Sequence, residues 1–396
     1  MIRSKANSKA RSKRPRSHKA AKSPSRQARR APETSHHGPL TQISIRGFRG
    51  IRELEVDGLA PLTVFTGDNG AGKSTLLEAV FAVYGRTTPV WIPGAQARRG
   101  FARVSRQGPS YLGLFYGLSE EGQAKISARA EDGSAFRLEI QRTTVGPHAV
   151  ILEPNSGGSF NQSDLADAVR AAPVEFRAFR DDVEENKSSL EWTFTPPNRW
   201  EMQARGAKPG RLPAAFLLSG EDFDEGDSGR FGDVREAGRD TDVIDVLRTI
   251  DPRVEQIEYL ETSKAQYFRA TLQDGRALPL GMLGGGLVTA FRHALALAFV
   301  ERGLVAIDEV GAGIHYRRLP DYFRGLLTPC KRLGAQLVLT THSFEALVAL
   351  VHAATELDPD RFAVVHLRRD DKDQVRATVI PGEKARSAVD HGYDLR

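Results

Sequence analysis

Cysteine is almost absent from this chain, since Cys330 is the only one among 396 residues. A single thiol can build neither a disulfide framework nor a cysteine metal site within the chain. No run approaches the roughly 18–20 consecutive apolar residues of a membrane-spanning helix, and no apolar signal region follows Met1. We therefore expect a cytoplasmic protein with no membrane contact. Apolar residues still make up 40% of the chain, enough for a sizeable core.

The first 38 residues hold almost no large apolar side chains and a single acid. Between Ile2 and Leu40 there is no Leu, Ile, Val, Phe, Tyr or Trp, and twelve Lys and Arg residues face one acid, Glu33. The remaining residues hold 44 basic and 49 acidic side chains, so the net charge of +6 hides a basic tail on an acidic body. Such a segment cannot bury a core, which predicts a disordered tail over residues 1–40. It is either a solvated extension or an electrostatic arm for nucleic acid.

The stretch VFTGDNGAGKSTLLEAVF, residues 64–81, contains the pattern GxxxxGK[ST]. It lies between an apolar strand, 62–66, and an apolar helix, 74–84, which is the setting of a phosphate-binding loop. Backbone N–H groups and the positive end of the helix would hold the phosphates of a nucleotide. We expect Lys73 to reach the β- and γ-phosphates and the Ser74 hydroxyl to bind Mg²⁺. The residues predicted to bind ATP here are Gly67, Asp68, Asn69, Gly70, Ala71, Gly72, Lys73, Ser74 and Thr75.

Two further apolar segments, GLVAIDE (303–309) and AQLVLTTHS (335–343), end in polar residues. Near-continuous apolar strands indicate a parallel sheet buried on both faces, and ligands collect at the carboxyl edge of such sheets. Asp308 would hold Mg²⁺ through water, and Glu309 stands where a general base activates the attacking water. His342 is placed to contact the γ-phosphate. The predicted catalytic residues are therefore Lys73, Glu309 and His342.

The remaining segments differ in how clearly they can be interpreted. Period-two patterns over 111–152, including YLGLFYGL, predict an antiparallel sheet. Residues 153–240 show no persistent pattern and no heptads, which predicts an inserted helical or irregular subdomain without a long coiled coil. A helix ending before Pro252, a second helix after the glycines at 284–286, and closing strands at FAVVHL and RATVIP complete the pattern. There are no internal repeats.

The order of these motifs resembles the ATP-binding-cassette (ABC) heads of the SMC/RecF group. Within that group the chain is similar to single-head ATPases related to the OLD (overcoming lysogenization defect) proteins, many of which act in anti-phage and abortive-infection systems. The resemblance covers residues 41–92 and 241–396 well, and 93–240 only loosely. The segments that carry it are IRGFRGI, YLGLFYGL, VIDVLRTIDPRVEQIEYL, PLGMLGGGL, AIDEVGAGIHYRRLPDYF, LVLTTHS and AVDHGYDLR.

The resemblance implies a homodimer in which two heads sandwich two ATP molecules. Each phosphate loop would face the partner's signature turn, here Gly284, Gly285 and Gly286. Arg49 matches an arginine that lies near the nucleotide in relatives, and residues 311–315 would face the partner's site. Met282 departs from the pattern, because relatives usually carry a serine there. No glutamine of the Q-loop type was identified, and the 54 residues after His342 are too few for a TOPRIM nuclease domain.

We therefore expect an α/β P-loop NTPase over 41–396: an ABC-type ATPase head with a mostly parallel core sheet, an antiparallel β subdomain, and the insertion at 153–240. The function expected is slow, Mg²⁺-dependent ATP hydrolysis that senses or gates a separately encoded effector, such as a nuclease, in anti-phage defence. Two alternatives stay open. One is a RecF-like DNA repair or recombination ATPase, and the other is an ATP-locked scaffold with little hydrolysis.

Overall fold

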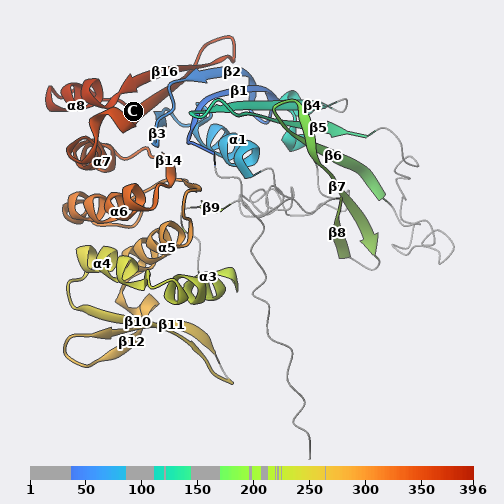
Figure 1. Cartoon of the computed structure of the whole chain (residues 1–396). Helices are drawn as coiled ribbons and strands as arrows, with labels where there is room; N and C mark the ends of the chain where they lie inside the picture. The colour runs from blue at the N-terminus through green and yellow to red at the C-terminus, as the bar shows by residue number, and fades with distance from the viewer. Residues whose placement is uncertain are drawn as a thin grey trace, which may run out of the picture. The chain divides into compact units, whose positions relative to one another are not determined.

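A six-stranded sheet in the order β16–β15–β3–β14–β13–β9 forms the centre of the fold (Figure 1). All of its strands run parallel except β16, which pairs antiparallel with β15. This arrangement confirms the prediction of a mostly parallel core sheet. The strands are β3 (Leu62–Gly67), β9 (Ala214–Leu217), β13 (Leu304–Ile307), β14 (Gln336–Thr340), β15 (Phe362–Arg369) and β16 (Val375–Pro381).

This computed structural model describes residues 37–85, 111–119, 122–143, 170–195, 199–206, 213–218, 220, 223, 225–263 and 265–396. Most of the predicted basic tail, residues 1–36, lies outside these ranges, and the first strand begins at Leu40. In the part of the chain that is described, no helix is long and apolar enough to cross a membrane.

The parallel strands are buried on both faces, so alternate residues belong to different cores. Val305 and Ile307 of β13 pack into one core, whereas Leu304 and Ala306 pack into the other. The same alternation holds in β14, where Leu337 and Leu339 pack into the first core and Val338 packs into the second. A strand with two buried faces needs apolar residues at every position, which explains the continuous apolar runs in the sequence.

An antiparallel sheet of seven strands, in the order β2–β1–β4–β5–β6–β7–β8, lies across α1 (Lys73–Gly85) from the parallel sheet (Figure 1). The apolar side chains of α1 are buried between the two sheets, which confirms the helix predicted after the phosphate loop. The strands are β1 (Leu40–Phe48), β2 (Ile51–Asp57), β4 (Gln123–Ala130), β5 (Ala135–Arg142), β6 (Arg170–Arg180), β7 (Val183–Thr195) and β8 (Arg199–Gly206).

Two parts of the sequence prediction need correction here. Residues 170–206, placed in a helical or irregular insertion, instead extend the antiparallel sheet as β6–β8. The alternation was hidden because the inward positions of β7 include buried polar residues, Asn186 and Ser188. The segment YLGLFYGL, expected as a strand, forms two short 3-10 helices, Tyr111–Leu114 and Tyr116–Leu118.

Helices cover the other face of the parallel sheet, followed by a small three-stranded sheet, β10–β11–β12. The helix before Pro252, the strand after it, the helix after the glycine turn and the two closing strands all form as predicted. These elements are α3 (Glu225–Glu236), α4 (Asp240–Ile250), β10 (Val254–Glu261), β11 (Gln266–Leu272), β12 (Ala277–Pro279), α5 (Gly285–Phe299), α6 (Leu319–Leu333), α7 (Phe344–Leu357) and α8 (Gly382–Asp390).

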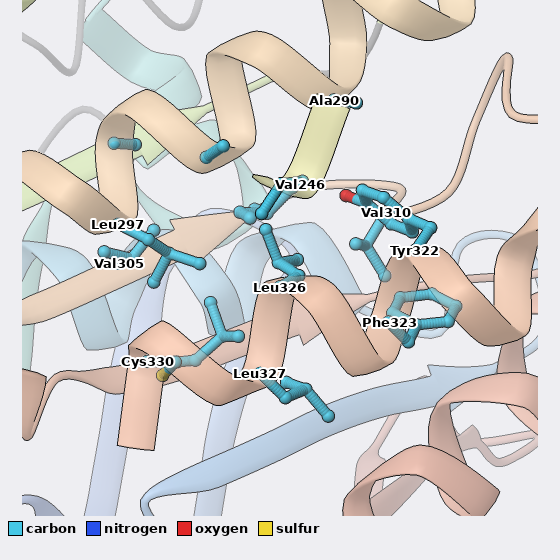
Figure 2. Close-up of a cluster of buried hydrophobic side chains, with 14 of the residues drawn as sticks. Val246, Ala290, Leu297, Val305, Val310, Tyr322, Phe323, Leu326, Leu327 and Cys330 are labelled. Atoms are coloured by element: carbon cyan, nitrogen blue, oxygen red, sulfur yellow. The ribbon is translucent and has the colours of Figure 1, made fainter. Parts of the chain in front are cut away.

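The core between α4, α5, α6 and β13 is dense and almost wholly apolar (Figure 2). Val246 of α4 and Leu326 of α6 lie close together at its centre, with Val305 on the sheet side. Cys330 lies in the same core, and its thiol donates to the backbone oxygen of Ala335 at 3.4 Å. Burial raises the pKa of this thiol to about 12. Cys330 is therefore a small core residue in its protonated form.

Candidate nucleotide-binding site

The phosphate loop connects β3 to α1 at the carboxyl edge of the parallel sheet. Lys73 is only 7% exposed, and its Nζ donates to the backbone oxygens of Gly67 at 2.7 Å and Asp68 at 3.1 Å. The ammonium group is therefore held inside the loop by two carbonyls, which phosphate oxygens can replace.

The glycines of the loop serve two different purposes. A Cβ at Gly67, where φ is +131°, would lie 2.1 Å from the backbone oxygen of Leu367 on β15. Gly67 is thus required for close packing of β15 against β3. At Gly70, where φ is +80°, no atom of the described residues lies within 4 Å of such a Cβ. The top of the loop is open, as a ligand that approaches the backbone requires.

Ser74 and Asp308, the two predicted magnesium ligands, are joined directly. The Ser74 hydroxyl donates to Asp308 Oδ1 at 3.0 Å, although 234 positions separate the two residues. Asp308 is 8% exposed, and the hydroxyl of Thr340 also donates to Oδ1, at 2.6 Å. A hydroxyl beside a carboxylate suits Mg²⁺, a hard cation that takes oxygen ligands and is commonly bound by one or two carboxylates together with substrate phosphates. In the described ranges, no three His, Cys, Asp or Glu side chains gather as a metal site of their own.

Glu309 and His342, the predicted base and phosphate contact, form a pair. His342 Nδ1 lies 2.5 Å from Glu309 Oε2, and the two side chains are 65% and 27% exposed, respectively. Glu309 has a left-handed backbone with φ of +57°, which is uncommon outside glycine. Its N–H donates to Thr340 Oγ1 at 2.8 Å, so Thr340 holds both acidic residues in place. Sequence reasoning missed Thr340, although its place at the end of LVLTT was the available signal.

Arg49 lies beside the loop, but its guanidinium is already engaged. The side chain forms a buried ion pair with Glu78, one turn along α1 from Ser74. Arg49 also has a left-handed backbone, with φ of +52°, and its N–H donates to the Leu114 oxygen at 2.9 Å. A nucleotide contact by Arg49 therefore stays a prediction.

Among the backbone hydrogen bonds of the described residues, none joins the glycines at 284–286 to the phosphate loop. They begin α5 and adjoin the loop 311–315: a Cβ at Gly286 would lie 2.7 Å from the Gly313 oxygen. A cavity of about 500 Å³ opens between them. Met282 beside this cavity is 74% exposed. The residues that line the cavity are Ile250, Leu283, Gly284, Gly286, Leu287, Gly313, Ile314, His315, Arg317 and Arg318.

The last residues of the chain also lie at the carboxyl edge of the sheet. Thr66, the residue before the phosphate loop, donates its hydroxyl to the Leu395 oxygen at 2.5 Å. The Arg396 guanidinium lies 5.2 Å from the ring centre of Phe344, which follows the His342 turn. The sequence offered no signal for this contact beyond the segment AVDHGYDLR itself.

A family model described as "AAA domain, putative AbiEii toxin, Type IV TA system" matches residues 62–349, which include the phosphate loop and both acidic residues. The chain belongs to this family. An AAA-type P-loop domain agrees with the parallel sheet order and with the position of the loop between β3 and α1.

Individual relatives match this AAA-domain chain over shorter stretches. An "ATP/GTP phosphatase" of Helicobacter pylori is 24% identical over 102 residues, 26% of this chain and 28% of that protein. A "DNA replication and repair protein RecF" of a Cyanothece species is 30% identical over 152 residues, 36% of each chain. The chain thus aligns with about a third of the length of these relatives. A solved SMC head, crystallised with the C-terminal winged-helix domain of ScpA, has a TM-score of 0.47 at 12% identity, covering 88% of this chain and 99% of that one.

Proposed function

We propose that this chain binds and hydrolyses ATP with Mg²⁺ at the phosphate loop. The observation that carries the proposal is the hydrogen bond between Ser74 and Asp308, with the Glu309–His342 pair at the same sheet edge. A helix-start hydroxyl, a strand-end carboxylate and a second carboxylate beside a phosphate loop are the parts that nucleotide hydrolysis requires. The family assignment, which spans all of these residues, supports the same conclusion.

Each residue has a distinct part in the proposed reaction. Lys73 would exchange its carbonyl partners for phosphate oxygens and so neutralise their charge. Glu309 would accept a proton from the attacking water. The oxygen of that water would bond to the γ-phosphorus as the bond from the phosphorus to the bridging oxygen breaks. His342, hydrogen-bonded to Glu309, would orient that carboxylate and lie near the γ-phosphate. Mg²⁺, held through Ser74 and Asp308, would supply charge neutralisation on the phosphate oxygens.

We propose further that two copies meet head to head. The proposal rests on the resemblance to ABC heads, in which each phosphate loop faces the partner's glycine turn, and on the cavity that Gly284 and Gly286 line. Glycine allows backbone N–H groups to approach a phosphate, and Arg317 and Arg318 at the cavity add positive charge. The homodimer through the ATP sites would then bury Met282, which is exposed in the single chain.

The biological role we propose is to sense or gate a separately encoded effector, possibly a nuclease, in anti-phage defence. The resemblance to OLD-like single heads and the family description, with its putative toxin of a type IV system, support this role. A RecF-like DNA repair ATPase is the second candidate, favoured by the RecF similarity and the basic tail. Turnover stimulated by DNA would favour repair, and ATP-dependent assembly without phosphate release would favour a scaffold.

The direct test is a pair of variants at the site. Lys73→Ala should abolish binding of a fluorescent ATP analogue, because the main phosphate grip is lost. Glu309→Gln should retain binding, lose at least ~10²-fold in phosphate release, and trap a dimer on size exclusion. Glu301→Gln, at an exposed carboxylate outside the site, is the control. Near-normal phosphate release by Glu309→Gln would contradict the assignment of Glu309 as the general base.

A further inference from the structure

Arg369, at the end of β15, fastens the phosphate loop to two other turns. Its Nε donates to the Gly70 oxygen at 3.1 Å, at the open top of the loop. Its Nη2 donates to the Gly50 oxygen at 2.8 Å, in the turn between β1 and β2. Its Nη1 donates to Asp373 Oδ1 at 2.6 Å, in the turn between β15 and β16. Nη1 also donates to the Asp373 backbone oxygen at 3.3 Å. The planar guanidinium has donors at fixed angles, so these four acceptors define one position of the loop.

Asp373 connects this contact to a fourth segment. Its Oδ2 accepts from the Tyr116 hydroxyl at 2.7 Å, so each carboxylate oxygen has a different donor. The hydrogen bond from Tyr116, with that from Arg369, lowers the pKa of Asp373 below its usual range. Tyr116 thereby reaches the phosphate loop through Asp373 and Arg369 without touching the loop itself.

The segment that contains Tyr116 also braces the turn at Arg49. Leu114 accepts the hydrogen bond from the Arg49 N–H, and Phe115 is bridged to Phe48. Phe115 is 1% exposed, so residues 111–118 are anchored in the core beside this turn. The Gly50 carbonyl that binds Arg369 belongs to the same turn. Residues 111–118 are thus linked to the phosphate loop by two routes.

We propose that Arg369 is a positioning residue for nucleotide binding, and that Asp373 and Tyr116 transmit the position of residues 111–118 to the phosphate loop. The inference rests on the proposed nucleotide binding at that loop. With the Gly70 peptide fixed from outside, the N–H groups that meet the phosphates need not be ordered when the ligand binds. Pre-ordered groups bind more tightly than groups that must be ordered on binding.

The test compares dissociation constants for a fluorescent ATP analogue across a set of variants. Arg369→Gln should weaken binding about tenfold, the usual order for hydrogen bonds from a charged group. Arg369→Lys keeps the positive charge but loses the planar set of donors, so it should weaken binding nearly as much as Arg369→Gln does. Tyr116→Phe removes only a hydroxyl and should weaken binding up to about fivefold. The control is Arg376→Gln, on the same hairpin, 72% exposed and paired with Asp370.

The outcomes separate positioning from simple charge attraction. Full rescue by Arg369→Lys, with wild-type affinity in Tyr116→Phe, would overturn the proposal, because charge alone would then explain Arg369. If Arg369→Gln does not fold, Tyr116→Phe decides, since losing one exposed hydroxyl leaves the core intact. Lys73→Ala distinguishes the two levels of inference. If that variant also binds normally, the proposed site is wrong, whereas loss there with no effect at Arg369 and Tyr116 contradicts only the positioning role.

Discussion

Met282 is the residue whose replacement we expect to speed ATP hydrolysis. In the proposed dimer it stands where related heads carry a serine whose hydroxyl donates to the γ-phosphate, and methionine has no such donor. Its side chain is 74% exposed, so packing within the described chain does not account for it. We expect the glycines to preserve binding across the dimer while the transition state lacks one hydrogen bond.

Met282→Ser should therefore accelerate single-turnover ATP hydrolysis, by as much as ~10²–10³ if the hydroxyl aligns fully. Nucleotide affinity should change little, because the added donor acts mainly on the transition state. Val183→Ser, at another exposed apolar residue on β7, is the matched control. A wild type that already turns over fast, at a rate that Met282→Ser leaves unchanged, would contradict a slow, latched ATPase.

At the same scale, the sequence predicted those site residues whose chemistry follows from their own type and neighbours. Lys73 lies in a contiguous motif, and Asp308 and Glu309 end an apolar run, so their positions were recognisable. Arg369 was not, because its acceptors are backbone oxygens 299 and 319 positions away, and any residue has a backbone oxygen. Contacts of that kind have no sequence signature.

A polar contact joins α5 and α6 within their apolar interface. His293 Nδ1 lies 2.5 Å from the Tyr322 hydroxyl, and both side chains are buried. Burial lowers the pKa of His293 to about 3, so the ring is neutral and forms a hydrogen bond with the hydroxyl in which one of the two groups donates. This pair joins α5 to α6, and both groups are uncharged near neutral pH.

This pair predicts a pH dependence of stability. In the unfolded chain the His293 ring takes up a proton below pH ~6.5, whereas in the folded protein it does so only near pH 3. Protonation of the unfolded chain therefore lowers the free energy of unfolding as the pH falls below ~6.5, and the full stability is present only above that pH. The slope approaches ~1.4 kcal/mol per pH unit. In urea unfolding between pH 6 and 4, His293→Leu with Tyr322→Phe should show a shallower slope than Tyr322→Phe alone. Parallel slopes would contradict the burial argument.

Helices and strands were predictable wherever the apolar residues of a segment followed a single spacing. Strands β13 and β14 have two apolar faces, and β4 and β5 alternate strictly, so both patterns were clear. The 3-10 segment at 111–118 was mistaken for a strand because its apolar residues also recur at short intervals. Its backbone turns at Gly117, where φ is +66°, and Leu118, where φ is +56°. Phe115 of this segment is 1% exposed and bridged to Phe48, which the local pattern does not show.

For the whole molecule, charge separation between tail and body leads to the last prediction. Deleting residues 1–36, which include all twelve cations, should leave fold and basal ATPase activity unchanged, because it retains the buried His37, which packs against Tyr84 and Phe136. If the twelve cations contact nucleic acid, deletion should weaken that binding and make its salt dependence shallower by ~0.7–0.9 in log K per lost phosphate contact. Equal binding by both forms across a salt titration would assign the tail no such role.

The buried thiol of Cys330 makes the surface of this protein free of reactive sulfur. Since it is the chain's only cysteine and its buried thiol stays protonated, an alkylating label should react with it only slowly in the folded protein. A cysteine introduced at position 282 or 316 would then be the preferred attachment point for a fluorophore or a cross-linker. Single cysteines can thus be introduced into the native sequence, one at a time, to map the surface through which two copies contact each other.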